Sequence, residues 1–224
     1  MEYSQYFLTY TLLPELKAVA DPQRATRQIQ YLKNHFQCLG VRAPEVRKIS
    51  YRLINTHELV DSPNAIDLME TAIDAPFREI HHFGIHLVLK YVSKSDDYFH
   101  HTLEKMITTN SWWDSVDGLA GSVDQYLRKY PKKTYELAYR WMESENIWLQ
   151  RSAILFQLKR KETTDTELLK AMILSVADSK EYFLQKAAGW ALRQYAKTNP
   201  AWVGTFINGH KLPTLTVREG SKYL

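Results

Sequence analysis

The chain has 224 residues, of which 45% are hydrophobic and 24% are charged. This length suits one domain or a compact array of repeats, and this composition excludes an intrinsically disordered chain. The 29 lysines and arginines outnumber the 25 aspartates and glutamates, a small excess that is compatible with a polyanionic partner but does not by itself indicate one.

Cysteine content and the N-terminal sequence both bear on the compartment. The single cysteine, Cys38, excludes an intrachain disulfide and suits a reducing environment, and we expect it to be a small buried residue. The segment "MEYSQYFLTYTLLPELK" lacks the basic start and the long apolar core of a signal peptide. No later stretch is long enough to cross a bilayer. We therefore expect a cytoplasmic protein that does not enter a membrane.

Helical patterns follow one another along the chain. Prolines stand where helices are expected to begin, in "RAPEVRK", "DSPNAI", "DAPFREI" and "TNPAW". Apolar residues recur three and four positions apart in "FGIHLVLKYV", "RSAILFQLK" and "KAAGWALRQYA". Alternating strand patterns are scarce. The sequence thus predicts an all-α fold of roughly a dozen helices with short connections and no sheet.

The helical segments repeat. "WLQRSAILFQLK" begins at Trp148 and "FLQKAAGWALRQ" begins at Phe183, 35 residues later, and nearly the same spacing leads back to Trp113 and Phe77. Each of these four aromatic residues is expected to open a long helix that is followed by a shorter one. Helix pairs with a period near 35 predict an α-α superhelix of HEAT-like repeats. We expect a single helical-repeat domain over residues 1–224, with a concave surface built from equivalent helices.

One face of these long helices gathers polar and aromatic residues. Numbered from each opening aromatic residue, positions 0, 3, 4 and 7 share a face. In chain order that face carries His81, Trp113, Asp117, Arg151, Lys186 and Trp190. A lone tryptophan on a helix is usually core, and a lone aspartate is usually a surface group or a cap. Their recurrence on equivalent faces of successive helices favours a functional site.

The adjacent tryptophans of "NSWWDSVD" have different expected roles. Trp112 continues into Val116, Leu119, Val123 and Leu127, which is the spacing of a buried helix face. We therefore assign Trp112 to packing. Trp113 lies one helical turn before Asp117, so we expect these two side chains to be displayed together.

The segments "SWWDSVD", "WLQRSAILFQLK", "FLQKAAGWALRQY" and "YLKNHFQCLGV" together resemble bacterial DNA alkylation-repair glycosylases of the AlkD type. The resemblance extends from about Tyr31 to the C-terminal "LPTLTVREGSKYL" and agrees with the helical repeat. It implies hydrolysis of the N-glycosidic bond of positively charged N3- or N7-alkylated purines in duplex DNA. It also implies that the lesion is held without enclosing the base in a pocket. Some relatives that lack the N-terminal helix or the site residues have no glycosylase activity.

The resemblance assigns roles to five residues of this chain. Asp117 matches the catalytic aspartate, and Trp113 and Trp190 match the tryptophans of the cleft. Arg151 matches an arginine that contacts phosphate, and Tyr31 matches a tyrosine of the N-terminal helix. A carboxylate can stabilise the oxocarbenium-like sugar and orient water, and indole faces attract cations. No acid is needed to protonate a base that already carries a positive charge.

Further cations share helical spacing with Trp190. Lys186, Arg193 and Lys197 are expected to extend a track for DNA phosphates, although an ordinary solvated helix face has the same pattern. His82 and His86 stand four residues apart, but no third ligand lies at a recognisable distance. We therefore expect no metal and no cofactor.

Two alternatives remain open at the level of the sequence. A helical-repeat protein could bind damaged or branched DNA without catalysis, and Asp117 would then be dispensable. A scaffold could instead bind a protein on its concave face, with Trp190 and Arg151 as anchors. Our prediction is a monomeric DNA glycosylase for alkylated purines that acts on double-stranded DNA in base excision repair.

Overall fold

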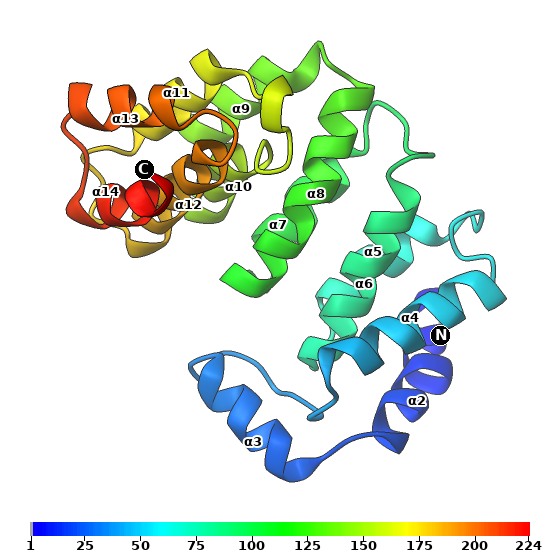
Figure 1. Cartoon of the computed structure of the whole chain (residues 1–224). Helices are drawn as coiled ribbons and strands as arrows, with labels where there is room; N and C mark the ends of the chain where they lie inside the picture. Colours follow the sequence, from blue (N-terminus) through cyan, green and yellow to red (C-terminus); the bar gives the residue numbers. More distant parts are fainter. Residues whose placement is uncertain (1) are drawn as a thin grey trace. The chain divides into compact units, whose positions relative to one another are not determined.

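Helices are the main regular structure in the part of the chain that the structure describes. The structure is a computed structural model that describes residues 2–224. Within that range no strand forms, and Gln37 and Phe77 share one isolated β-bridge. The chain packs as two compact units, Met1–Asn110 and Ser111–Leu224 (Figure 1). The all-α prediction is confirmed, whereas a single domain over residues 1–224 stays a prediction.

The first unit is built around α6. Its α4 and α5 pack against α6, α1 and α7 pack against α5, and the stacked rings of Phe7 and Phe83 join the N-terminal helix to this core. Cys38 is buried, as expected. The helices are α1 (Tyr3–Phe7), a π-helical turn (Leu8–Leu12), α2 (Leu13–Ala18), α3 (Pro22–Tyr31), α4 (Ala43–Thr56), α5 (Ala65–Ile73), α6 (Arg78–Tyr91) and α7 (His100–Thr108).

A buried carboxylate fixes the loop between α3 and α4. Glu79 of α6 accepts hydrogen bonds from the backbone amides of Leu39, Gly40 and Val41, at donor–acceptor distances of 2.9 to 3.1 Å. Its side chain is almost fully enclosed. Backbone amides that converge on a carboxylate make strong, charge-assisted hydrogen bonds. The loop is therefore anchored to α6 although its own sequence is not helical.

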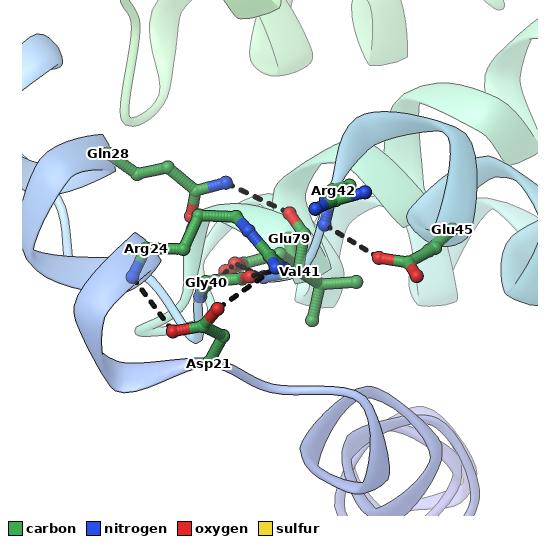
Figure 2. Close-up of polar contacts among 8 residues, drawn as sticks. All are labelled: Asp21, Arg24, Gln28, Gly40, Val41, Arg42, Glu45 and Glu79. Carbon is green, nitrogen blue, oxygen red and sulfur yellow. Dashed lines mark hydrogen bonds and ion pairs between the residues drawn. The ribbon is translucent and has the colours of Figure 1, made fainter.

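The same loop holds α3, which has no buried residue of its own. Arg24 donates to the carbonyl of Gly40 at 2.7 Å, and Gln28 donates to the carbonyl of Val41 at 2.9 Å (Figure 2). Gly40 has φ of +83°, and a Cβ built there would lie 2.0 Å from the carbonyl oxygen of Asp21. Only glycine allows this approach. Polar contacts with this loop thus help to position α3.

The second unit packs the first helix of each repeat pair against the first helix of the next pair. α10 packs against both α8 and α12, α9 packs against α10 and α11, and α14 lies on α12. Tyr126, Trp141 and Phe156 are fully buried in this unit. The helices are α8 (Trp113–Lys129), α9 (Lys133–Glu143), α10 (Ile147–Leu155), α11 (Thr166–Ser175), α12 (Tyr182–Ala196), α13 (Pro200–Gly209) and α14 (Thr214–Gly220), with 3-10 turns at Lys161–Thr163 and Ser221–Tyr223.

The four aromatic residues of the repeat do stand at helix starts. Phe77 directly precedes α6, Trp113 begins α8, and Trp148 and Phe183 are the second residues of α10 and α12. The expected alternation of long and short helices is wrong at the third pair, because α10 has 9 residues and α11 has 10. After α10, Gln157 exchanges two hydrogen bonds with the backbone of Asp165, which closes the connecting loop.

The repeated Leu-Gln pair has a structural explanation. Gln150 donates to the carbonyl of Ser144 at 2.8 Å, and Gln185 donates to the carbonyl of Ser179 at the same distance. Both glutamines lie in the first turn of their helix and satisfy a carbonyl of the preceding connection. The two repeats therefore reuse one side chain to close equivalent turns.

Candidate active site

A carboxylate–guanidinium pair joins α8 to α10. Arg151 donates from Nε to Oδ1 of Asp117 at 2.7 Å and from Nη2 to Oδ2 at 2.9 Å. The Arg151 side chain is 4% exposed and that of Asp117 is 19% exposed. Two parallel hydrogen bonds fix both the position and the plane of a carboxylate. Asp117 is therefore held in one orientation while part of it remains open to solvent.

Arg151 also reaches a third helix. Its Nη1 donates to the carbonyl of Phe183, in the first turn of α12, at 2.7 Å. The start of α10, which carries Arg151, is capped by Asn146, whose side chain accepts from the amides of Trp148 and Leu149. One buried guanidinium thus ties α8, α10 and α12 together at the carboxylate.

The charge state of Asp117 reflects two opposing effects. Burial raises the pKa of the Asp117 carboxyl above its ordinary value. The hydrogen bonds and the charge of Arg151 lower this pKa, and nearby Asp114 raises it further. The result is a carboxyl that is protonated more readily than an exposed aspartate, yet has a cation in direct contact.

The two tryptophans expected beside Asp117 lie on two of the three linked helices. Trp113 is half-buried and lies one turn before Asp117 on α8. Trp190 is half-buried and lies two turns after Phe183 on α12. Counted from the opening aromatic residue of each helix, Trp113 is at position 0 and Trp190 is at position 7, which lie on the same helix face. Their joint action on a nucleotide stays a prediction.

Trp112 packs as the sequence predicts. Its ring lies 5.8 Å from that of Trp148 and 5.2 Å from that of Phe183, and the last two rings are 5.0 Å apart. The four residues that follow Trp112 at core spacing, Val116, Leu119, Val123 and Leu127, are all buried. This aromatic cluster joins the starts of α8, α10 and α12 and supports the helix ends next to Asp117 and Arg151.

Several candidate residues have contacts that differ from those expected. Arg151 is enclosed and bound to protein groups, so it does not project into solvent as a phosphate ligand would. His81, which the helical spacing placed on the shared face, is also buried, with its ring nitrogens 2.6 Å from the carbonyl of Ala75 and 2.9 Å from Arg78. Helical spacing predicts a shared face, but neighbouring elements decide whether that face is covered.

The cations on α12 have partners that the sequence pattern did not indicate. Lys186 lies 2.9 Å and Arg193 lies 3.1 Å from the carboxylate of Glu219, which belongs to α14. Lys197 is exposed, with its Nζ 4.9 Å from the ring centre of Tyr223. Their expected contacts with DNA stay predictions. The sequence interpretation missed Glu219, because no local pattern connects it to α12.

Tyr31 is displayed in the first unit. It is the last residue of α3, and its side chain is 67% exposed. An aromatic side chain at the end of a helix without buried residues contributes little to a core. Its exposure is compatible with contact with a ligand, which stays a prediction.

The histidines of α6 include one with a strongly shifted pKa. Burial lowers the pKa of His86 to about 4, and its ring packs edge-on against Tyr51. Across residues 2–224 no group of three His, Cys, Asp or Glu side chains is arranged to hold a metal ion. Over the same residues, no helix is long and apolar enough to span a membrane.

Comparison with known proteins identifies the family. The sequence model of the DNA alkylation repair enzyme family matches residues 12–224. The structure is similar to one described as a predicted DNA alkylation repair enzyme from Enterococcus faecalis, with a TM-score of 0.85 and 31% identity, covering 92% of this chain and 96% of that chain. No curated protein matches the chain.

A second solved structure shows the same fold at lower identity. It is AlkD2 from Streptococcus mutans, with a TM-score of 0.64 and 17% identity, covering 89% of this chain and 99% of that chain. The helical-repeat fold expected from the sequence is therefore confirmed. The family match includes all of the candidate site residues and nearly the whole sequence. The chain belongs to the DNA alkylation repair enzyme family.

Proposed function

We propose that this protein is a DNA glycosylase that hydrolyses the N-glycosidic bond of cationic N3- or N7-alkylated purines in duplex DNA. Asp117 is the catalytic carboxylate, and Trp113 and Trp190 flank the sugar of the damaged nucleotide. The family supports alkylation repair as the process. The observation that carries the glycosylase chemistry is the bidentate pair of Asp117 with Arg151, which preorganises one carboxylate on α8, the helix of Trp113, and is linked by Arg151 to α12, the helix of Trp190.

The proposed reaction needs a single carboxylate. The bond between C1′ of the sugar and the purine breaks, and its electron pair leaves with the base and neutralises the base's positive charge. The sugar becomes oxocarbenium-like, and a fixed negative charge stabilises it more in the transition state than in the ground state. The oxygen of water bonds to C1′, and its proton passes to Asp117. No leaving-group acid is required.

Partial burial makes this carboxylate more effective. A charge in a poorly solvated site interacts with a developing cation more strongly than the same charge in water. Burial also raises the pKa of Asp117, which would neutralise the group if nothing opposed it. Arg151 supplies that opposition, so we assign it as a positioning residue that keeps Asp117 ionised and oriented.

The tryptophans supply a surface for the cationic nucleotide. Indole faces attract positive charge and pack against the carbon–hydrogen groups of a sugar. Trp113 and Asp117 share one face of α8, so a sugar that contacts the indole lies within one helical turn of the carboxylate. Trp190 approaches from α12, the helix that Arg151 links to the pair.

The test measures free methylated purine released from methylated duplex DNA by wild-type protein and by Asp117→Asn. Asparagine keeps the shape and an acceptor oxygen for Arg151 but has no charge. We expect release by the wild type and a loss of at least about a hundredfold in the variant, because electrostatic groups of this kind contribute on that scale. Duplex affinity, measured in parallel, should change little.

A binding protein without catalysis gives a different result. It would release no base in either form and would still bind duplex DNA in a salt-sensitive manner, since phosphate contacts release counterions. Full activity in Asp117→Asn would contradict the proposed mechanism directly. A melting curve of each protein establishes that both are folded during the assay.

A further inference from the structure

Glu219 gathers three cations around one carboxylate. Its Oε1 lies 2.9 Å from Nζ of Lys186, and its Oε2 lies 3.1 Å from Nη1 of Arg193 and 2.8 Å from Nζ of Lys222. We call Lys186, Arg193 and Lys222 the C-terminal cation cluster. The three cations and the Glu219 carboxylate together have a net charge of +2. The contacts with Lys222 and Lys186 lower the pKa of Glu219 to about 2, so the carboxylate stays ionised near neutral pH.

Two glycines allow Glu219 to reach this position. A Cβ at Gly189 of α12 would lie 2.6 Å from Cβ of Glu219, and a Cβ at Gly220 would lie 3.0 Å from Cβ of Leu192. Thr216 of α14 adds a hydrogen bond to the carbonyl of Gln185 at 3.0 Å. Because α14 lies directly on α12, the carboxylate is set between Lys186 and Arg193, and the chain then turns so that Lys222 joins them.

The negative charge is enclosed and the positive charges face outward. The side chain of Glu219 is 4% exposed, whereas those of Lys186, Arg193 and Lys222 are 35%, 26% and 46% exposed. A ligand that approaches from solvent therefore meets ammonium and guanidinium groups. The shared carboxylate also orders three long side chains before a ligand binds, which lowers the conformational-entropy cost of binding.

The position of the cluster indicates its ligand. Lys186 lies four residues before Trp190 and Arg193 lies three residues after it, so all three share one face of α12. We propose that the C-terminal cation cluster, ordered by Glu219, binds a backbone phosphate of duplex DNA next to the nucleotide held at Trp190. This inference rests on the proposed function and adds Lys222 and Glu219 to the DNA-binding residues.

Two explanations predict opposite effects of Glu219→Gln on the affinity for duplex DNA. If positive charge alone determined affinity, removing a carboxylate would strengthen the binding of duplex DNA. If Glu219 orders the cluster, the variant binds roughly three- to tenfold more weakly, because three side chains lose their shared anchor. The probe is an unmodified, fluorescently labelled oligonucleotide duplex, with the dissociation constant measured by anisotropy at several salt concentrations. Tighter binding by Glu219→Gln would overturn the ordering role.

Lys222→Gln tests the phosphate contact without disturbing the fold. Its side chain is exposed and lies in the last 3-10 turn, so thermal stability should remain close to that of the wild type. We expect weaker duplex binding and a salt-dependence slope reduced by about 0.9, the change for one lost phosphate contact. Lys132→Gln, which removes the same charge at the exposed turn before α9, is the matched control and should keep the wild-type slope.

Two further outcomes separate this inference from the proposed function. Equal slopes for Lys222→Gln and Lys132→Gln, with normal binding by the wild type, would overturn the phosphate site alone. A wild-type protein that does not bind duplex DNA at any salt concentration would overturn the proposed function and the site with it.

Discussion

Replacing Glu79 with glutamine should loosen the loop that anchors α3. In the wild type, Oε1 accepts from the amides of Leu39, Gly40 and Val41, and Oε2 also accepts from Leu39. Glutamine keeps one oxygen, loses the charge, and turns an amide group toward the amide of Leu39. Charge assistance contributes about 1 kcal/mol to each hydrogen bond. We therefore expect a loss of about 3 kcal/mol in the stability of this loop.

Glu45→Gln is the matched control. Glu45 also accepts a backbone amide, that of Arg42 at 3.2 Å, but this single hydrogen bond lies at the surface. Its loss should cost less than about 1 kcal/mol. The two variants remove the same charge from unit one, so any difference between them reports on burial and on the number of amides that converge.

Two assays locate the effect. Amide hydrogen exchange at residues 39–41 should accelerate in Glu79→Gln and remain unchanged in Glu45→Gln. Urea unfolding followed by far-ultraviolet circular dichroism measures the wider loss. All six tryptophans lie at residue 112 or later, so tryptophan fluorescence reports on the second unit and should change little. Equal stability and equal exchange in the two variants would refute the anchoring role of Glu79.

Three other predictions concern Gly40, Asp117 and Arg151. Gly40→Ala should destabilise the first unit by at least about 2 kcal/mol in urea unfolding, because φ is +83° and the added Cβ meets backbone atoms; wild-type stability would contradict this. Base release should fall on acidification with a midpoint above 3.8, because burial raises the pKa of Asp117 and only the carboxylate acts; a midpoint of base release below 3.8 would contradict the assignment. By the same shift, the folded state binds this proton more tightly than the unfolded chain does. The stability that protonated Asp117 contributes is therefore lost as pH rises through its folded pKa. Arg151→Gln should move the acid limb of base release to higher pH, because the group that opposes protonation of Asp117 is gone; an unchanged limb would exclude a positioning role.

Local periodicity was sufficient to predict much of the candidate site. Trp113 and Asp117 share a face of α8 because helix geometry places residues four apart on one side, and the structure has that helix. The same spacing assigned Trp112 to packing, which its contacts with Trp148 and Phe183 confirm. The repeat also predicted which aromatic residues stand at helix starts.

The partners of charged residues were not predictable in this way. Asp117 and Arg151 are 34 residues apart. Each is a charged residue of a type that usually lies on the protein surface. Their pairing depends on α8 lying beside α10, and it encloses Arg151 beside the carboxylate. Whether Arg151 contacts phosphate or acts as the positioning residue proposed above stays a prediction. The burial of His81 was not predictable for the same reason, because neighbouring elements decide whether a helix face is covered.

The periodicity that places residues three and four apart on one helix face is a local property, since it follows from the backbone hydrogen bonds within each helix. It is enough to identify the all-α class, the repeat and the candidate face with Asp117, Trp113 and Trp190. Long-range contacts depend on how closely two helices approach, and small residues such as Gly189 decide that distance. Glu79 below the α3 loop and Glu219 among its three cations became visible only through such contacts, because tertiary packing determines which carboxylates are buried and which cations they order.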